Sequence, residues 1–381
     1  MSEELVVVGG SVATTSFLER LRQLGETRPI MVIDGDGDAP YDRPPLSKRF
    51  LIQGDFDDLA VDWSDLDATL VHGWAVGVRP ESSVVHIRNN VGGEWELAYE
   101  QLVIATGATP VRLPIEPSDT LTLRSAEDAR RLRALAGDGQ RVTVIGAGAI
   151  GVELASSLVE RGSHVTLLDR AHGPLERLLS GHLANDLTRW LAATGVDCRW
   201  GVDITAIRRT GSGWQVNLDD GTRLDSDVVV SAVGARPSVE WLSGTSLLTD
   251  GMLLANDSGR VVNSNGVVAR HFAIGDVVSR LRPDGSIERT ESWAAARQHG
   301  AQLAEELCGV SGDRVPEPYF WTEVAGRKIQ VVGSLRPSME LDVEFENPEL
   351  GGVLYRASEG DSVAWIGVNA QSRIAQLLMG G

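Results

Sequence analysis

The sequence predicts an α/β fold built from two strand–turn–helix units of the same kind, with a small α+β part at the C-terminal end. Two short apolar runs, Leu5–Val8 and Val142–Ile145, have the composition of buried parallel strands. A glycine-containing turn and then apolar residues at helical spacing follow each run. Glycine makes up 42 of the 381 residues, about 11%, whereas its usual share is ~7%. At about 150 residues per domain, this length corresponds to two or three domains.

Composition and charge narrow the class of protein. Hydrophobic residues make up 42% and charged residues 23%, as in ordinary globular domains. The net charge of −18 argues against binding to nucleic acid or to an anionic membrane, although it leaves a local basic patch open. No apolar run approaches the ~20 residues of a membrane helix, and the start Met1–Glu4 lacks the basic residues of a signal peptide. We therefore expect a soluble, cytoplasmic protein.

The first unit has the layout of a dinucleotide-binding site. The turn Gly9–Thr14 follows the strand at Leu5–Val8, and a helical pattern follows the turn. A second apolar run, Ile30–Ile33, ends at Asp34. In such a layout the helix N-terminus faces a pyrophosphate and the carboxylate binds the ribose hydroxyls.

The glycine pattern of this first unit is incomplete, because Ser11 and Thr14 stand where glycines are usual. An ordinary strand–helix turn therefore remains an alternative to a nucleotide site. The loop after the second strand also leaves open which of two aspartates binds the ribose. The candidate nucleotide-binding residues of this unit are Gly9, Ser11, Ala13, Asp34 and Asp36.

The second unit carries a complete GxGxxG pattern. It lies between the strand at Val142–Ile145 and a helix that begins near Val152, which is the context that this motif requires. The next strand, Val165–Leu168, ends at Asp169. The candidate nucleotide-binding residues of this unit are Gly146, Gly148, Ile150, Gly151, Glu153 and Asp169.

One nucleotide in each unit indicates a flavin and a nicotinamide, between whose rings hydride passes. The carboxylate of Asp169 accepts hydrogen bonds from ribose hydroxyls and repels a 2′-phosphate, which favours NADH over NADPH. Arg170 lies next to this carboxylate in the sequence and weakens the preference. The predicted cofactors are therefore FAD and NADH.

A proline-rich segment, Pro40–Lys48, follows the first unit. It is either a plain surface loop or a stiff backbone that holds Arg43 and Lys48 against a pyrophosphate and a flavin ring. Together with the two glycine turns, this segment resembles the FAD-dependent NADH:ferredoxin reductases that serve Rieske dioxygenases and bacterial cytochromes P450, the putidaredoxin reductase and biphenyl dioxygenase ferredoxin reductase type.

The resemblance extends along nearly the whole chain. It covers the segments Leu102–Ala108, Leu123–Ala129, Val228–Pro237, Phe272–Asp276, Glu291–Trp293 and Phe320–Glu323. It implies that Asp276 holds the ribityl chain of FAD, that Glu291–Trp293 lies at the flavin ring at the start of a helix, and that Trp321 reaches the flavin from the C-terminal domain. The further cofactor-binding residues that it implies are Val76, Ala105, Thr106, Gly107, Arg124, Gly234, Gly275 and Ser292.

The resemblance also implies a glutathione-reductase-like arrangement of interleaved Rossmann-like domains. The FAD domain would comprise residues 1–112 and 238–315, the NAD domain residues 113–237, and the C-terminal domain residues 316–381. The C-terminal tail is shorter than is usual in the family, which puts any partner contact made by the tail in doubt. A homodimer is left open.

The implied mechanism places the nicotinamide on the flavin near Lys48 and Glu153, the two candidate catalytic residues. Lys48 would stabilise negative charge on the reduced flavin. The resemblance favours a place for Glu153 in this pocket, and the alternative is a carboxylate in the first helical turn that interacts with the helix dipole. Single electrons would then leave for a [2Fe–2S] ferredoxin.

Cysteine usage separates this chain from its relatives. Residues 1–197 contain no cysteine, which excludes the thiol relay of disulfide reductases near the flavin. We expect Cys198 and Cys308 to be two lone buried thiols, although one long-range disulfide stays open. The seven histidines show no metal-binding spacing, and no metal is expected.

Two other functions stay open. One is an NADH-dependent reductase of a small molecule, such as a quinone or a radical, without a protein partner. The other is a redox sensor that resembles apoptosis-inducing factor. If an acidic ferredoxin is the partner, the candidate docking residues are Arg297, Arg327, Lys328 and Arg373.

Overall fold

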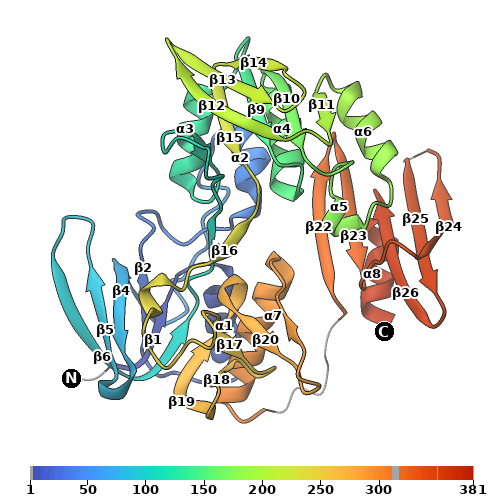
Figure 1. The fold of residues 1–381 in the computed structure, drawn as a ribbon. Helices are drawn as coiled ribbons and strands as arrows, with labels where there is room; N and C mark the ends of the chain where they lie inside the picture. Colours follow the sequence, from blue (N-terminus) through green and yellow to red (C-terminus); the bar gives the residue numbers. More distant parts are fainter. Residues whose placement is uncertain (1–2, 311–316, 350, 381) are drawn as a thin grey trace. The chain divides into compact units, whose positions relative to one another are not determined.

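The computed structural model describes residues 3–310, 317–349 and 351–380. The chain divides into two compact units (Figure 1). Unit 1 consists of Met1–Asp42, Asp57–Thr109 and Arg236–Val315, and unit 2 of Arg43–Phe56, Pro110–Ala235 and Pro316–Gly381. The three predicted domain boundaries remain predictions, and the one at residues 315 and 316 lies outside the described residues.

Unit 1 contains an eleven-stranded sheet within its described residues. Nine strands form a continuous path in the order β21-β20-β17-β18-β19-β6-β1-β2-β3, and β5 joins β4 to β6. The strands are β1 (Glu3–Val8), β2 (Ile30–Asp34), β3 (Ala68–His72), β4 (Trp74–Arg79), β5 (Val84–Arg88), β6 (Glu94–Ile104), β17 (Leu254–Ala255), β18 (Arg260–Asn263), β19 (Gly266–Ala273), β20 (Ser279–Leu281) and β21 (Ile287–Glu288).

The central strand β1 is buried on both faces, as its uninterrupted apolar run predicts. Leu5 and Val7 pack on one face with the helices α1 (Val12–Gln23) and α7 (Trp293–Leu307). Val6 and Val8 pack into a second core on the other face of the sheet. Because β1 pairs in parallel with both β2 and β6, the carboxyl ends of these three strands lie at one edge of the sheet.

Helices α1 and α7 lie side by side (Figure 1). A Cβ atom on Gly300 of α7 would overlap the carbonyl oxygen of Ala13 on α1, so this close approach depends on glycine. The side chain of Ser16 reinforces the contact by donating a hydrogen bond of 2.8 Å to the Arg297 carbonyl.

Unit 2 repeats the parallel strand–helix arrangement. Its first sheet has the order β11-β10-β9-β15-β8, and a three-stranded antiparallel sheet, β12-β13-β14, follows β11 along the chain. The strands are β8 (Leu121–Thr122), β9 (Arg141–Ile145), β10 (His164–Asp169), β11 (Asp197–Trp200), β12 (Ile204–Thr210), β13 (Gly213–Leu218), β14 (Arg223–Ser226) and β15 (Val228–Ser231). The helices are α2 (Arg49–Gln53), α3 (Ala126–Leu135), α4 (Ala149–Glu160), α5 (Glu176–Leu179) and α6 (Ala184–Ala193).

Local sequence explains where two of the helical segments begin. Ser125 and Asp128 form a capping box, in which the serine hydroxyl accepts the Asp128 N–H and the aspartate accepts the Ser125 N–H. The proline-rich segment is not a plain loop, because Pro44 and Pro45 start a 3-10 helix, Pro44–Ser47, whose first turn needs no N–H donors from them.

The C-terminal part of unit 2 is an antiparallel five-stranded sheet with one helix, which agrees with the predicted α+β class. The strand order is β22-β23-β26-β25-β24. The elements are β22 (Tyr319–Val324), β23 (Arg327–Val332), β24 (Glu340–Asn347), β25 (Gly352–Glu359), β26 (Ser362–Val368) and α8 (Gln371–Gly380). The two short strands β7 (Ala108–Pro110) and β16 (Ala235–Pro237) contain two of the points where the chain passes between the units.

Burial of the two cysteines differs from the prediction. Cys198 and Cys308 are both free thiols, but each is half-buried rather than fully buried. Cys198 lies on β11, and the other three residues of this strand are half-buried or exposed. The incomplete burial of Cys198 follows from its place on this strand. Within residues 3–310, 317–349 and 351–380, no helix has the length and apolarity to cross a membrane.

Candidate functional site

The first glycine turn passes tightly against the end of strand β6. Gly9 has φ of +109°, and a Cβ atom on it would overlap the carbonyl oxygen of Ala105. The same Cβ would lie 3.1 Å from the Thr106 nitrogen. A side chain at this position would therefore force the turn away from the sheet, whereas glycine lets α1 begin directly at the sheet edge.

Thr14 replaces the last glycine of the usual pattern without opening this turn. Its side chain is fully buried, and its hydroxyl donates a hydrogen bond of 2.5 Å to the Gly9 carbonyl oxygen. In the second unit a Cβ on Gly151 would overlap the equivalent Gly146 carbonyl oxygen. The threonine hydroxyl thus makes a bond to the turn at a place where the second unit has only close backbone packing.

The second glycine turn has the same shape. Gly146 has φ of +98°, and a Cβ on it would lie 2.5 Å from the carbonyl oxygen of Ala232, which follows β15. Gly148 is the N-cap of α4, and a Cβ on it would meet nothing within 4 Å. The space in front of this helix N-terminus is therefore open, as binding of a phosphate group requires.

An aspartate stands beside each turn in the same place. Asp169 ends β10, and its Oδ2 accepts the Ala147 N–H at 2.6 Å while its Oδ1 accepts the Ala171 N–H at 2.8 Å. Asp34 ends β2, and a Cβ on the neighbouring Gly10 would lie 2.8 Å from Asp34 Oδ2. Asp34 is thus the counterpart of Asp169, because each carboxylate lies against the second residue of its turn.

Asp36, the other candidate ribose ligand, is engaged differently. The Tyr41 hydroxyl donates a hydrogen bond of 2.5 Å to Asp36 Oδ2, and His72 Nδ1 lies 3.0 Å from the Asp36 carbonyl oxygen. These contacts fasten the loop that follows β2.

In unit 2, Glu153 is the centre of a buried polar cluster. Its Oε2 lies 2.8 Å from Lys48 Nζ and accepts the Ser47 hydroxyl at 2.5 Å. Its Oε1 accepts the Thr322 hydroxyl at 2.6 Å. The side chains of Lys48 and Glu153 are only 12% and 6% exposed, so the carboxylate is held by charge and hydrogen bonds where little water reaches it.

The same cluster includes an aromatic ring. Lys48 Nζ lies 4.6 Å and Lys328 Nζ 4.7 Å from the centre of a Trp321 ring, both within the range of cation–π attraction. Lys48 Nζ also donates a hydrogen bond of 2.9 Å to the Pro44 carbonyl, so the 3-10 helix positions its ammonium group. Three segments distant in sequence therefore meet at Glu153.

One expectation for Glu153 is wrong. The carboxylate does not lie in the first turn of its helix, because α4 begins at Ala149 and its first turn contains no acidic residue. Glu153 occupies the second turn, where the helix dipole is weaker and the carboxylate instead bonds to side chains of other segments.

The remaining predicted residues of unit 2 include Arg43, Ile150 and Gly234. Arg43 donates a hydrogen bond of 2.7 Å from Nη1 to the Arg124 carbonyl. Ile150 is 41% exposed in the first turn of α4. Gly234 has φ of +116°, and a Cβ on it would meet nothing within 4 Å.

The predicted residues of unit 1 lie along the sheet edge and at the start of α7. The Thr106 hydroxyl donates to the Ser238 carbonyl at 2.8 Å, and Gly107 at φ +68° ends the segment after β6. A Cβ on Gly275 would lie 3.1 Å from Ala13 Cβ, which brings the Gly275–Asp276 turn to α1. Val76 lies on β4 and is 36% exposed.

Helix α7 begins where the sequence predicts. Ser292 is its N-cap and accepts the Ala295 N–H at 3.1 Å. The Trp293 indole donates a hydrogen bond of 2.9 Å to Asp42 Oδ1, and Glu291 forms an ion pair with Arg289. Burial lowers the pKa of the Arg289 guanidinium, and the carboxylate of Asp276 opposes that effect.

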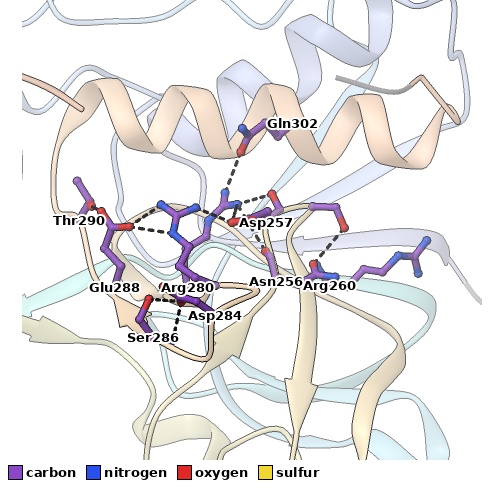
Figure 2. A network of polar contacts seen from close by, with 11 residues as sticks. Asn256, Asp257, Arg260, Arg280, Asp284, Ser286, Glu288, Thr290 and Gln302 are labelled. Carbon is purple, nitrogen blue, oxygen red and sulfur yellow. Dashed lines mark hydrogen bonds and ion pairs between the residues drawn. The ribbon is translucent and has the colours of Figure 1, made fainter. Parts of the chain in front are cut away.

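A network of charged side chains fastens α7 to the neighbouring strands (Figure 2). Arg280 is 5% exposed and donates to the Asp257 carbonyl and, at 3.1 Å, to Gln302 Oε1 of α7. Arg282 pairs with both Asp257 and Glu288 at 2.5 Å. Burial lowers the pKa of Arg280 to about 10, so it stays charged at neutral pH.

Several residues that bond the predicted site residues carry no sequence signal of their own. Ser47 and Thr322 bond Glu153, and His299 accepts the Gly275 N–H at 3.3 Å through Nδ1. Burial, together with the charges of Arg280 and Arg282, lowers the pKa of His299 to about 3. The serine and threonine lie within recognised motifs, but only the fold connects them with Glu153. Within the part of the chain that the structure describes, no group of three or more His, Cys, Asp or Glu is placed to hold a metal ion.

Comparison with known proteins identifies the family. The sequence model of the pyridine nucleotide-disulphide oxidoreductase family matches residues 3–300. The chain belongs to this family. Pyridine nucleotide-disulphide oxidoreductases use FAD and NAD(P)H, in agreement with the two glycine turns.

Individual relatives within the pyridine nucleotide-disulphide oxidoreductases confirm the resemblance to ferredoxin reductases. The chain is 29% identical over 354 residues to a rubredoxin-NAD(+) reductase of Ectopseudomonas oleovorans, covering 91% of this chain and 90% of that protein. It is 28% identical over 346 residues to the ferredoxin–NAD(+) reductase component of a 3-phenylpropionate/cinnamic acid dioxygenase of Photorhabdus laumondii, covering 88% and 85%. The structure matches the reductase in the covalent putidaredoxin reductase–putidaredoxin complex with a TM-score of 0.88 and 25% identity, covering 99% and 92%.

Proposed function

We propose that the chain is an FAD-dependent NADH:ferredoxin oxidoreductase, which passes electrons from NADH to a [2Fe–2S] ferredoxin that serves a Rieske oxygenase or a cytochrome P450. The observation that carries this proposal is the duplicated site: each unit has a tight glycine turn and an aspartate against the second residue of that turn. One unit then binds FAD and the other binds NADH.

Unit 1 would hold FAD. The turn at Gly9 offers the N-terminus of α1 to the pyrophosphate, and Asp34 would bind the adenosine ribose. The buried hydroxyl of Thr14 donates a hydrogen bond to the Gly9 carbonyl. This contact supports the view that Thr14 stabilises the turn and does not block the FAD site. Asp276 would hold the ribityl chain, at the end of a turn that His299 fastens through the Gly275 N–H.

Unit 2 would hold NADH at the turn Gly146–Gly151. Both oxygens of Asp169 accept backbone N–H groups, so the carboxylate is fixed in place before a ribose binds. A fixed negative charge repels the 2′-phosphate of NADPH, which supports the preference for NADH. Substitution of Asp169 by Asn should therefore reduce the preference for NADH.

Lys48 and Glu153 would act on the electron-transfer step. Bound FAD would supply the chemistry that connects hydride from NADH with single electrons for the acceptor. The Lys48 ammonium is fixed by Glu153 and by the Pro44 carbonyl, so it presents a positioned positive charge in a site with little water. Glu153 in turn balances this charge when the nucleotide is absent. No proton transfer by a protein group is needed.

The acceptor is proposed from two kinds of support. The first 197 residues contain no cysteine, so electrons leave the flavin without a thiol relay. Relatives are named for ferredoxin, rubredoxin and putidaredoxin, which are small redox proteins. Lys328 on β23 and Arg373 in the first turn of α8 lie at the same end of the C-terminal sheet, since the Asn369 N–H, just before α8, donates to the Lys328 carbonyl. These cations would attract an acidic partner.

An anaerobic titration with NADH, and separately with NADPH, tests the two-nucleotide proposal. A yellow protein whose main flavin band bleaches at stoichiometric NADH, and responds more weakly to NADPH, is the expected result. A protein that does not bind FAD after reconstitution would refute the proposal.

Acceptor specificity needs a second experiment. Reduction of cytochrome c should saturate with added [2Fe–2S] ferredoxin, and the rate should fall with rising salt because docking is electrostatic. Saturation with rubredoxin instead, or fast turnover with a quinone alone, would contradict the proposed acceptor. Charge reversal at Arg373, which lies outside the Glu153 cluster, should raise the KM for ferredoxin and leave ferricyanide reduction unchanged.

A further inference from the structure

Trp74 is an unusually exposed aromatic residue. It is the first residue of β4 and 56% exposed, and among the residues that the structure describes no other Trp, Phe or Tyr is as exposed. A single exposed apolar side chain is common on protein surfaces, so the contacts of this ring, rather than its exposure, carry the argument.

The indole ring lies against the backbone of Gly35. A Cβ atom on Gly35 would overlap the six-membered part of the ring, which therefore fills the space that any other residue would need for its side chain. The indole Nε1 donates a hydrogen bond of 3.2 Å to Asn90 Oδ1. The Gly73 N–H donates to the Asp34 carbonyl at 2.9 Å, which joins the start of β4 to the end of β2.

These contacts place the ring against the residue that follows Asp34, whose carboxylate we assign to the adenosine ribose. Gly35 directly follows Asp34, so the indole covers the residue next to that ligand. Strand β4 also has a register shift between Ala75 and Gly77, which leaves Val76 as the extra residue of a bulge. Bulges re-aim the backbone, and this one lies two residues from the ring at the exposed end of the strand.

We propose that Trp74 forms an aromatic wall of the adenine site and stacks on the adenine of FAD. The inference rests on the proposed function, in which unit 1 binds FAD with Asp34 on the ribose. Every base has a π-face, and aromatic side chains stabilise bases by stacking on that face. Trp74 is then a specificity-determining residue, because it contributes to binding of FAD and not of flavins that lack the adenosine part.

Flavin affinity measured on the apoprotein tests the proposal without any activity assay. Trp74→Ala should raise the Kd of FAD about 30-fold, the middle of the range expected for loss of one base–aromatic stack. The Kd of FMN, which has no adenine, should stay the same. Trp74→Phe should keep most of the FAD affinity. Val267→Ala is a matched control, since Val267 is 55% exposed on β19, on the other side of β6 and β1 from β2.

A second variant addresses the ring position separately. Gly35→Ala should push the indole away from its place, because the new methyl group would overlap the ring. FAD affinity should fall, and the same change should have no further effect in the Trp74→Ala background. Equal losses in both backgrounds would show that Gly35 acts independently of the ring, and would overturn the proposal.

The outcomes distinguish this inference from the function on which it rests. Unchanged or tighter FAD binding by Trp74→Ala, or equal weakening of FAD and FMN, would overturn the stacking role while the wild-type protein still binds FAD. A wild-type protein that binds no FAD would overturn the proposed function itself. Far-UV circular dichroism of each apoprotein variant shows that it is folded.

Discussion

Replacing Lys48 by methionine removes the only cation bonded to the buried Glu153 carboxylate in the described part of the chain. Methionine keeps most of the apolar stem of the lysine, so the volume of the side chain changes little. The carboxylate stays in place with its two hydroxyl donors, Ser47 and Thr322. The substitution therefore removes the ammonium group with its three contacts, to the Glu153 carboxylate, the Pro44 carbonyl and the Trp321 ring, and the cycle with Glu153→Gln separates the first of these from the other two.

The expected loss follows from the geometry of the pair. Two unit charges 2.8 Å apart attract each other by about 6 kcal/mol at an effective dielectric constant of about 20. The remaining hydroxyl donors compensate part of this, so the free energy of unfolding should fall by about 3 kcal/mol, at the low end for removal of one partner from a buried pair. The loss should persist at high salt, because salt screens buried pairs weakly.

Calorimetry on the full chain measures this effect. For a loss of about 3 kcal/mol, the melting temperature of the unit 2 transition should fall by about 6 to 12 °C. Arg336→Met is the matched control, since Arg336 and Glu359 form an exposed pair at 3.2 Å with side chains 57% and 40% exposed. Such a pair contributes about 0 to 1 kcal/mol. In a double-mutant cycle with Glu153→Gln the two losses should not add.

Either of two results would refute this reasoning. One is a loss for Lys48→Met no larger than that of the exposed control. The other is strict additivity in the cycle. The same variant should also slow flavin reduction by NADH, and an unchanged rate would remove the proposed role of Lys48 in electron transfer while leaving its structural role intact.

Further predictions concern hydrogen bonding and protonation. Thr322→Val should slow flavin reduction in stopped-flow experiments about 10-fold, because Glu153 loses a buried hydroxyl donor, and Thr322→Ser should restore the rate. The pKa of His299 is lowered to about 3, so as pH falls below 6.5 the unfolded chain gains a proton that the native chain does not, and stability falls by about 3 kcal/mol between pH 7 and 4. Urea titrations should show a shallower fall for His299→Asn, which keeps an acceptor for the backbone, whereas superimposable profiles would contradict this. Burial raises the pKa of Cys198 to about 11 and also raises that of Cys308, so alkylation followed by mass spectrometry should be slow at neutral pH and faster at high pH.

The sequence was sufficient for the elements whose signals are local. Each apolar run of four residues is a buried parallel strand, and each glycine turn leads into a helix, because periodicity and glycine placement act within about twenty residues. Asp34 and Asp36, the two candidate ribose ligands, could not be distinguished in this way. The segment around them has no periodic pattern, and only the fold places Asp34 against Gly10 and bonds Asp36 to Tyr41.

Long-range contacts are what the sequence could not supply. Glu153 was expected either in a pocket or in the first helical turn, because its partners are far away along the chain. Ser47 precedes it by 106 residues, and Thr322 follows it by 169. Likewise, no pattern near Trp74 in the sequence predicts that its ring covers Gly35, which lies 39 positions earlier in the chain.

The distance between Glu153 and Thr322 has a consequence for synthesis of the protein. At about 5 to 20 residues per second, a ribosome adds Thr322 roughly 10 to 30 s after Glu153. Throughout that interval the nascent chain contains Lys48, Ser47 and Glu153, but β22 does not yet exist to enclose them. Strand β6 lacks one of its neighbouring strands for an equally long interval of synthesis, because its residue Leu102 pairs with His271 on β19. Both units are therefore completed only late in translation, and a chaperone that shields their open edges would protect the chain during this time.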